Sequence, residues 1–388
     1  MSKPKDAASR DGFAEARVGD GVLPQEFEGE QIPLILRHRD VRAAAKDWET
    51  FSSDAPFRVP IPSEEHVRTV RQIPIELDPP RHTAYRKLIE PWFRRPTKAD
   101  YIARIDALVA AVIKQLQYGG ETEITSEFAL PLQSRALAIL LEMPQSEADL
   151  WIGWGNSLYR EGDGIAKGKQ LDAYCRKQFE RARKDEGAGD FFAFLSRLER
   201  GGRPLCDDEL CGIANLTFAG GRDTVINAIS EIFAYIAGNP DLAQRIAMDR
   251  RLINSAVEEF VRWTSPLSFI GRVCPVETAV ASHLVPQDGR VGLCWASANY
   301  DADIFDNPTE FRPDRRPNPH MAFGSGKHTC LGAAHARTLL RALVEQLAPI
   351  AHTLEIVEEI PANEQIGEVR RRLGFNRLRV GFKSKEAG

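Results

Sequence analysis

The sequence predicts a mainly α-helical protein with a minor β portion. Apolar residues recur at helical spacing over most of the chain, and the longest such stretch runs from about Asp208 to Ala237. Short strand-like runs occur only near residue 32 and between about 264 and 297. There is neither an internal repeat nor a low-complexity tract, so we expect one compact domain over residues 31–388.

The first 200 residues alternate between irregular and helical segments. Residues 1–30 are polar and contain glycine, so we expect them to be poorly ordered or loosely packed. An apolar run over residues 32–37 predicts a strand, and residues 54–76, rich in proline and arginine, predict a long irregular connection. Helical spacing is found over 39–48, 84–94, 101–117, 129–142 and parts of 147–200.

The helix expected over 208–237 would be about 45 Å long. Because it is apolar on nearly all sides, it should be buried, and Gly238-Asn239-Pro240 gives it a clear end. A second helix is expected over 253–263 and a last one over 331–347. Between them, residues 299–329 form a meander rich in proline, aspartate and asparagine.

Composition narrows the classes of function. The 388 residues are 43% hydrophobic, and the net charge of −4 gives no basic excess for nucleic acid or an anionic membrane. The N-terminus lacks the apolar core of a signal peptide, and no run approaches roughly 20 apolar residues. The six cysteines are scattered without a CxxC pair. We therefore expect a cytoplasmic protein without a nucleic-acid or membrane partner.

The most specific segment is Phe323-Gly324-Ser325-Gly326-Lys327-His328-Thr329-Cys330-Leu331-Gly332. Its first two glycines allow turns and a close approach to a flat ligand. Cys330 precedes an apolar helix, whose amide groups and dipole favour the thiolate form that iron requires. The alternatives are a buried inert cysteine and a zinc site of Cys330, His328 and His335, whose spacing is unsuitable.

This segment resembles the haem-binding signature of the cytochrome P450 family, and the resemblance spans roughly residues 30–385. It implies the P450 fold, with haem b (iron protoporphyrin IX) between the long central helix and the cysteine-loop helix. Cys330 would be the iron ligand, and Phe323 and Gly324 would belong to the cofactor-binding loop.

Gly220-Gly221-Arg222-Asp223-Thr224 resembles the oxygen-activation motif of the same family. Two glycines leave room above a bound diatomic molecule, and the Thr224 hydroxyl can hydrogen-bond the Gly220 carbonyl and distort the turn. Asp223 and Thr224 would then relay protons. By itself, the pattern is also typical of a simple helix break or cap.

Glu259-Phe260-Val261-Arg262 resembles the ExxR helix of the family, in which residues three apart share a helix face and pair. An arginine from the meander would join the pair. Arg315 is the best match, and the adjacent Arg316 is the alternative. The implied role of this cluster is structural.

The carboxylates of haem need cationic or hydrogen-bonding partners inside the fold. His82 and Arg86, four residues apart on one helix face, resemble the family segment that supplies two of them. Arg272 and His328 match two further family positions. Any one of these residues alone is more typical of a surface charge.

The resemblance implies a monooxygenase that inserts one oxygen atom of O2 into a C–H bond of a small organic substrate, by hydroxylation or oxidative dealkylation. Electrons would come from a separate ferredoxin and an NAD(P)H-dependent reductase. Family position places residues 54–75 and 150–180 at the substrate pocket. It also places there Leu216, Ala219, Phe269 and Ile270.

Two other functions are compatible with the same motifs. One is a peroxide-driven peroxygenase, and the other is a haem-thiolate sensor or binding protein without catalysis. The Asp223-Thr224 pair argues against the first, because peroxygenase relatives typically lack this acid–alcohol pair. It argues against the second, because a sensor need not deliver protons to oxygen.

Overall fold

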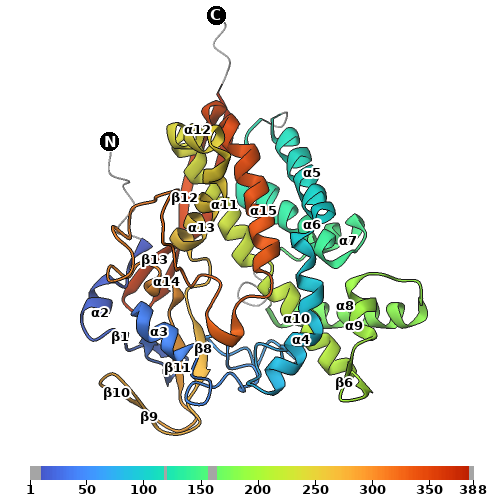
Figure 1. Cartoon of the computed structure of the whole chain (residues 1–388), viewed down its shortest axis with the longest axis vertical. Coiled ribbons are helices and arrows are strands. Elements are labelled where there is room, and N and C mark those ends of the chain that lie inside the picture. Colours follow the sequence, from blue (N-terminus) through green and yellow to red (C-terminus); the bar gives the residue numbers. More distant parts are fainter. Residues whose placement is uncertain (1–9, 118–119, 156–163, 384–388) are drawn as a thin grey trace, which may run out of the picture.

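The computed structural model describes residues 10–117, 120–155 and 164–383. A large helical body lies beside a smaller part that contains most of the strands (Figure 1). The main buried apolar cluster lies in the helical body, and two smaller clusters lie in the β-rich part. In the part of the chain that is described, no helix is both long and apolar enough to cross a membrane.

Of the N-terminal segment expected to be poorly ordered or loosely packed, residues 1–9 lie outside the described structure, and residues 10–30 are folded. It contains helix α2 (Ala14–Val18) and the short strands β1 (Val22–Leu23), β2 (Glu26–Phe27) and β3 (Glu30–Gln31). Phe13 is fully buried. The polar residues do not mark disorder here, because Arg10 pairs with the buried Glu231 and Arg17 binds both Asp11 and the distant Ser297.

The predicted strand near residue 32 is confirmed as β4 (Leu34–Ile35), which belongs to a four-stranded sheet. The strand order is β1-β4-β11-β8, with β4 and β11 parallel and the other neighbours antiparallel. Strands β8 (Ile270–Val273) and β11 (Arg290–Leu293) are joined through a hairpin of β9 (Thr278–Val280) and β10 (His283–Val285). Helices α3 (His38–Ala44) and α14 (Trp295–Ala298) pack against each other nearby.

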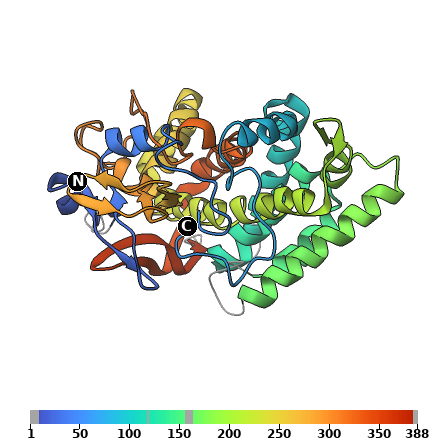
Figure 2. The same cartoon turned by 90° about the horizontal axis from the view of Figure 1, so that it is seen from below.

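The helical body follows the predicted segments closely. Helices α5, α6, α11, α13 and α15 pack together in its centre, and α8 runs along its outer edge (Figures 1 and 2). The elements before the long central helix are α4 (Arg81–Phe93), η1 (Arg95–Thr97), α5 (Ala99–Leu116), η2 (Ile124–Ala129), α6 (Leu130–Leu141), α7 (Gln145–Gly153), α8 (Gly164–Lys184) and α9 (Phe191–Ser196). A small hairpin of β6 (Glu199–Arg200) and β7 (Arg203–Pro204) follows.

The long central helix is interrupted, so the prediction of one continuous helix over 208–237 is wrong. Two helices, α10 (Asp207–Gly220) and α11 (Asp223–Gly238), follow one another across the body (Figure 2). The Gly221 carbonyl accepts a hydrogen bond from Gln133 Nε2 at 2.8 Å. A side chain of α6 thus satisfies a carbonyl that a continuous helix would have paired internally.

The C-terminal third supplies the cysteine loop and a long hairpin. Its helices are α12 (Pro240–Met248), α13 (Arg250–Thr264), η3 (Gly326–His328), α15 (Ala333–Leu347) and η4 (Ala348–Thr353). Strands β12 (Leu354–Ile366) and β13 (Val369–Phe382) form an antiparallel hairpin that was not predicted. Strand β5 (Thr122–Glu123) extends this hairpin to a three-stranded sheet.

Candidate active site

A cavity of about 340 Å³ is lined by helices α4, α10, α11 and α15 and by the loop that carries Cys330. Its wall brings together residues as far apart in the sequence as Ile73 and Leu340. The predicted site residues on this wall are His82, Arg86, Leu216, Ala219, Thr224, Ile270, Arg272, Phe323, Gly324, His328 and Cys330.

The cysteine loop is held by its own backbone. The Cys330 amide donates to the Phe323 carbonyl at 2.8 Å, and Gly324 and Gly326 have φ values of +73° and +72°. A Cβ atom at Gly326 would lie 2.7 Å from the Ala45 carbonyl oxygen, so this position requires glycine.

Cys330 is exposed toward the cavity and otherwise enclosed by protein. Desolvation raises the pKa of its thiol, whereas hydrogen bonds from the amide groups of Gly332 and Ala333 act in the opposite direction. Those amides begin helix α15, as expected for a sulfur meant to carry negative charge. A bound metal cation would lower the pKa of the Cys330 thiol further, because a thiol that coordinates a metal ion loses its proton.

Basic side chains gather on the same wall. The rings of His82 and His328 stack with their centroids 4.2 Å apart. His82 Nδ1 and His328 Nε2 are buried without a hydrogen-bond partner in the described structure. Burial and the neighbouring cations lower the pKa of His82 to about 4 and that of His328 to about 2, so neither ring is protonated in this environment.

Arg272 is 3% exposed, and its one hydrogen bond within the described chain is to the Gly271 carbonyl. Burial lowers its pKa to about 10. Arg86 differs, since its guanidinium donates to the carbonyls of Lys327 and Thr329 and so braces the cysteine loop. Together with the two histidines, these groups offer an anionic ligand the positive charge and unpaired donors that a dicarboxylate needs. The residues present therefore fit haem.

The zinc alternative gains no support. In the described ranges, no three His, Cys, Asp or Glu side chains are grouped in a way that could hold a metal ion. His335 Nδ1 is engaged with the Tyr101 hydroxyl at 2.7 Å. His335 nevertheless lines the cavity, and its Nε2 atom is buried without a partner in the described structure.

Thr224 is placed as the sequence predicts, but Asp223 is not. The Thr224 hydroxyl donates to the Gly220 carbonyl at 3.1 Å, which confirms the predicted distortion of the turn. Asp223 does not line the cavity that holds Cys330; it lines a second cavity on the other side of Thr224. The two residues thus face different spaces, and Thr224 borders both.

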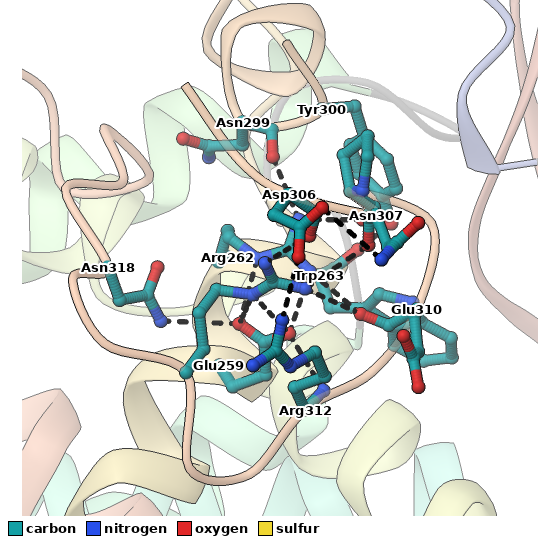
Figure 3. Close-up of polar contacts among 12 residues, drawn as sticks. Glu259, Arg262, Trp263, Asn299, Tyr300, Asp306, Asn307, Glu310, Arg312 and Asn318 are labelled. Atoms are coloured by element: carbon teal, nitrogen blue, oxygen red, sulfur yellow. Dashed lines mark hydrogen bonds and ion pairs between the residues drawn. The ribbon is translucent and has the colours of Figure 1, made fainter. Parts of the chain in front are cut away.

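The predicted ExxR cluster is buried, and Figure 3 shows the polar contacts around Glu259 and Arg262. The Glu259 carboxylate accepts two hydrogen bonds from Arg262 at 2.8 Å and further ones from the Arg312 amide and Asn318. Arg315 Nε donates to both carboxylate oxygens at 3.0 Å. Since Arg316 is exposed, the open choice between these two arginines is resolved in favour of Arg315.

Comparison with known proteins agrees with this geometry. The family model described as cytochrome P450 matches residues 165–347. A solved structure described as "The structure of a carbohydrate active P450" is 40% identical, covers 98% of this chain and 99% of its own, and superposes with a TM-score of 0.93. The chain belongs to the cytochrome P450 family.

Curated relatives of this P450 are monooxygenases. A steroid C26-monooxygenase from Mycolicibacterium smegmatis is 28% identical and aligns over 92% of this chain and 88% of its own length. A linalool 8-monooxygenase from Pseudomonas putida is also 28% identical, with 89% of each chain covered. The protein is therefore a cytochrome P450 monooxygenase, and its family implies a haem-iron cofactor.

Three of the four single residues predicted for the substrate pocket line the cavity that holds Cys330. Leu216, Ala219 and Ile270 line the cavity, whereas Phe269 packs away from it against Phe27, with ring centroids 5.7 Å apart. Strand alternation explains this, because neighbouring residues at the start of β8 point to opposite faces. From the predicted range 54–75, residues 73–75 line the cavity. Residues 150–155 and 164–180 do not, and 156–163 lie outside the described structure.

The second cavity measures about 830 Å³. It adjoins the first, since Ala219, Thr224, Pro266 and Leu267 line both. We call it the polar cavity. Its charged lining residues are Glu64, Glu123, Arg222, Asp223, Glu364 and Arg377. This cavity could not be predicted from the sequence, because its wall combines α11 with the C-terminal hairpin that was not predicted.

Proposed function

We propose that this P450 inserts one oxygen atom of O2 into a C–H bond of a small organic substrate, giving hydroxylation or oxidative dealkylation. The observation that carries the proposal is the exposed sulfur of Cys330 on the wall of a cavity that also holds unpaired basic groups. Bound haem b would supply redox-active iron, at which a thiolate ligand favours cleavage of the O–O bond.

The predicted site residues have three kinds of role in this proposal. Cys330 would bind the iron, and Phe323 and Gly324 would shape the loop that receives the cofactor. The two haem carboxylates would be held by His82, Arg86, Arg272 and His328. Glu259, Arg262 and Arg315 fix the meander that leads into the cysteine loop, and this role is structural.

Protons reach the reacting oxygen through Thr224 in this mechanism. The Thr224 hydroxyl donates to the Gly220 carbonyl in this structure. Rotation of the hydroxyl toward the cavity that holds Cys330 would let it donate to the reacting oxygen instead. Asp223, on the side of the polar cavity, replaces the proton that Thr224 gives up. The break between α10 and α11 supplies the space for this exchange.

For the substrate, we infer a carbohydrate. The solved relative that is 40% identical is described as carbohydrate active, and the polar cavity offers room for hydroxyl groups beside Thr224. Leu216 and Ile270 on the adjoining wall would contact the less polar part of the molecule.

We propose that a ferredoxin and an NAD(P)H-dependent reductase deliver the electrons. The P450 fold accounts for 98% of this chain, which supports a separate source for the flavin or the iron–sulfur cluster. We place the reaction in the cytoplasm, because all six cysteines are free thiols, which persist in a reducing compartment.

The test is a Cys330→Ser variant of the haem-loaded protein. The ferrous–CO spectrum of the parent should show the thiolate band, and the variant should lack it while remaining folded. An unchanged spectrum would exclude Cys330 as the ligand. Product formed with NAD(P)H and redox partners, but not with hydrogen peroxide alone, would separate the monooxygenase from a peroxygenase. No product under either condition would indicate a sensor.

A further inference from the structure

The polar cavity differs from the cavity that holds Cys330 in both size and chemistry. It is larger, at about 830 Å³ against about 340 Å³. Strands β12 and β13, helix α11 and the η2 segment supply its wall. Thr224, the proposed proton donor, borders it directly. A molecule seated there would therefore reach the reaction site without leaving the protein.

The charge of the wall limits what can bind. Four carboxylates, those of Glu64, Glu123, Asp223 and Glu364, face two guanidinium groups, those of Arg222 and Arg377. Three of these groups have ion-pair partners: Arg377 lies 3.6 Å from Glu358, Glu64 lies 2.5 Å from Arg68, and Glu364 lies 3.8 Å from Arg371. Because Arg68 also pairs with Glu76, the carboxylates still outnumber the guanidinium groups when these partners are included. An excess of negative charge disfavours an anionic ligand and leaves neutral or cationic molecules.

Several hydrogen-bonding groups on the wall have unused capacity. Arg222 is 1% exposed, and its Nη2 atom donates to the carbonyls of Trp151 and Gly155. Its Nε and Nη1 atoms are buried without a partner in the described structure, as is the Thr125 hydroxyl. Asn363 is exposed, and no side-chain hydrogen bond of Asn363 occurs within the described residues.

This mixture of groups suits hydroxyls. A hydroxyl donates one hydrogen bond and accepts two, so it can serve a carboxylate and a guanidinium or amide at once. Apolar side chains of Pro266, Leu267 and Phe375 complete the wall and provide contact for C–H groups. Buried unpaired donors such as those of Arg222 are costly unless a ligand or water satisfies them.

We propose that the polar cavity binds the hydroxyl-bearing part of a neutral carbohydrate and selects against acidic sugars, while the reacting C–H group reaches past Thr224 into the adjoining cavity. This deepens the proposed function and rests on it. The specificity-determining residues are Asn363 and Arg222, with the surrounding carboxylates setting the preference for a neutral ligand.

The first experiment titrates the haem-loaded protein and follows the shift of its absorption spectrum. The probes are neutral methyl glycosides of glucose, galactose and mannose, the matching methyl glycuronides, and methoxycyclohexane as an apolar ether. The best neutral glycoside should bind about tenfold more tightly than its glycuronide or the apolar ether, a difference of about 1.4 kcal/mol.

The second experiment changes the wall. Asn363→Lys should shift the preference toward the glycuronide by about tenfold, because it adds a cation to the wall. Gln365→Lys is the matched control, since Gln365 lies on the same strand, is exposed and does not line the polar cavity. Asn363→Ala should weaken binding of the neutral glycoside without reversing the preference.

The inference is overturned if no glycoside binds better than methoxycyclohexane, or if Asn363→Lys and Gln365→Lys change the preference equally. Such a result leaves the proposed reaction standing, provided that the thiolate band is present and the apolar ether is oxidised with NAD(P)H and redox partners. Loss of the thiolate band in the parent protein contradicts the proposed reaction itself, whatever the glycosides do.

Discussion

At the scale of single residues, the Thr224 hydroxyl has one partner in the structure and a second one in the proposed mechanism. Its hydroxyl satisfies the Gly220 carbonyl at 3.1 Å, and in the proposed mechanism it also donates to the substrate side. Asp223 cannot replace it, because Asp223 faces the polar cavity instead. In the proposed mechanism, Thr224 is therefore the link between protons from the polar cavity and the reaction site.

We expect Thr224→Ala to keep haem and substrate binding but to lower the product formed per NAD(P)H by tenfold or more, on the order of the contribution of a positioned acid. The electrons should appear as hydrogen peroxide. Thr224→Ser retains a hydroxyl and should restore most of the product. Full coupling in the alanine variant would place the proton path elsewhere.

His335 gives a prediction on stability. Burial lowers its pKa from 6.5 to about 4. Between these pH values the unfolded chain binds more protons than the folded one, so stability is complete above pH 6.5 and falls as the pH drops toward 4. The loss should reach about 3 kcal/mol at most.

Urea unfolding of the parent and of His335→Gln at pH 7 and pH 5 measures this contribution. The variant has a side chain of similar size that does not titrate, so its stability should fall less between the two values. An equal fall in both proteins would assign the pH dependence to other groups.

At the scale of elements, the sequence predicted most helices to within a few residues but missed the interruption of the central one. The Gly220–Thr224 hydrogen bond is local and could be foreseen. The break also depends on Gln133, which caps the Gly221 carbonyl, and on Arg222, which reaches the carbonyl of Trp151. Both partners are distant in sequence, and no spacing rule predicts them. Phe269 was wrongly predicted to line the pocket, because the sequence does not show which face of the sheet each residue of a short strand points to.

Glu259 on helix α13 allows a prediction about stability. This carboxylate is fully buried between Arg262 and Arg315. Glu259→Gln removes the negative charge and leaves two buried guanidinium groups uncompensated, which should cost about 3–5 kcal/mol of unfolding free energy. The meander should loosen as well, so the variant should retain less haem.

Glu258→Gln is the matched control on the same helix. Glu258 pairs with Arg337 and His320, but its side chain is 31% exposed. Water therefore compensates part of the loss, and the effect should stay near 1 kcal/mol. Equal losses of stability and haem in the two variants would show that burial of the Glu259 cluster is not what holds the meander.

At the scale of the whole molecule, α11 joins the two ends of the chain. Glu231 on α11 is 1% exposed and accepts hydrogen bonds from Arg10 at 2.7 Å and from the Gly374 amide at 3.2 Å. The guanidinium of Arg10 also lies over the ring of Trp263, 3.6 Å from its centroid. A polar N-terminal segment could not be predicted to fold, because the partner of Arg10 follows 221 residues later.

The ion pair between Arg10 and Glu231 makes the position of the start codon structurally important. A polypeptide that started downstream of residue 10 would lack Arg10. Glu231 on α11 would then lose one of its two arginine neighbours and keep only Arg372. Such a product would carry every recognisable motif of the family and still fold less firmly. An initiation codon placed downstream of residue 10 would thus remove a buried ion pair from this enzyme.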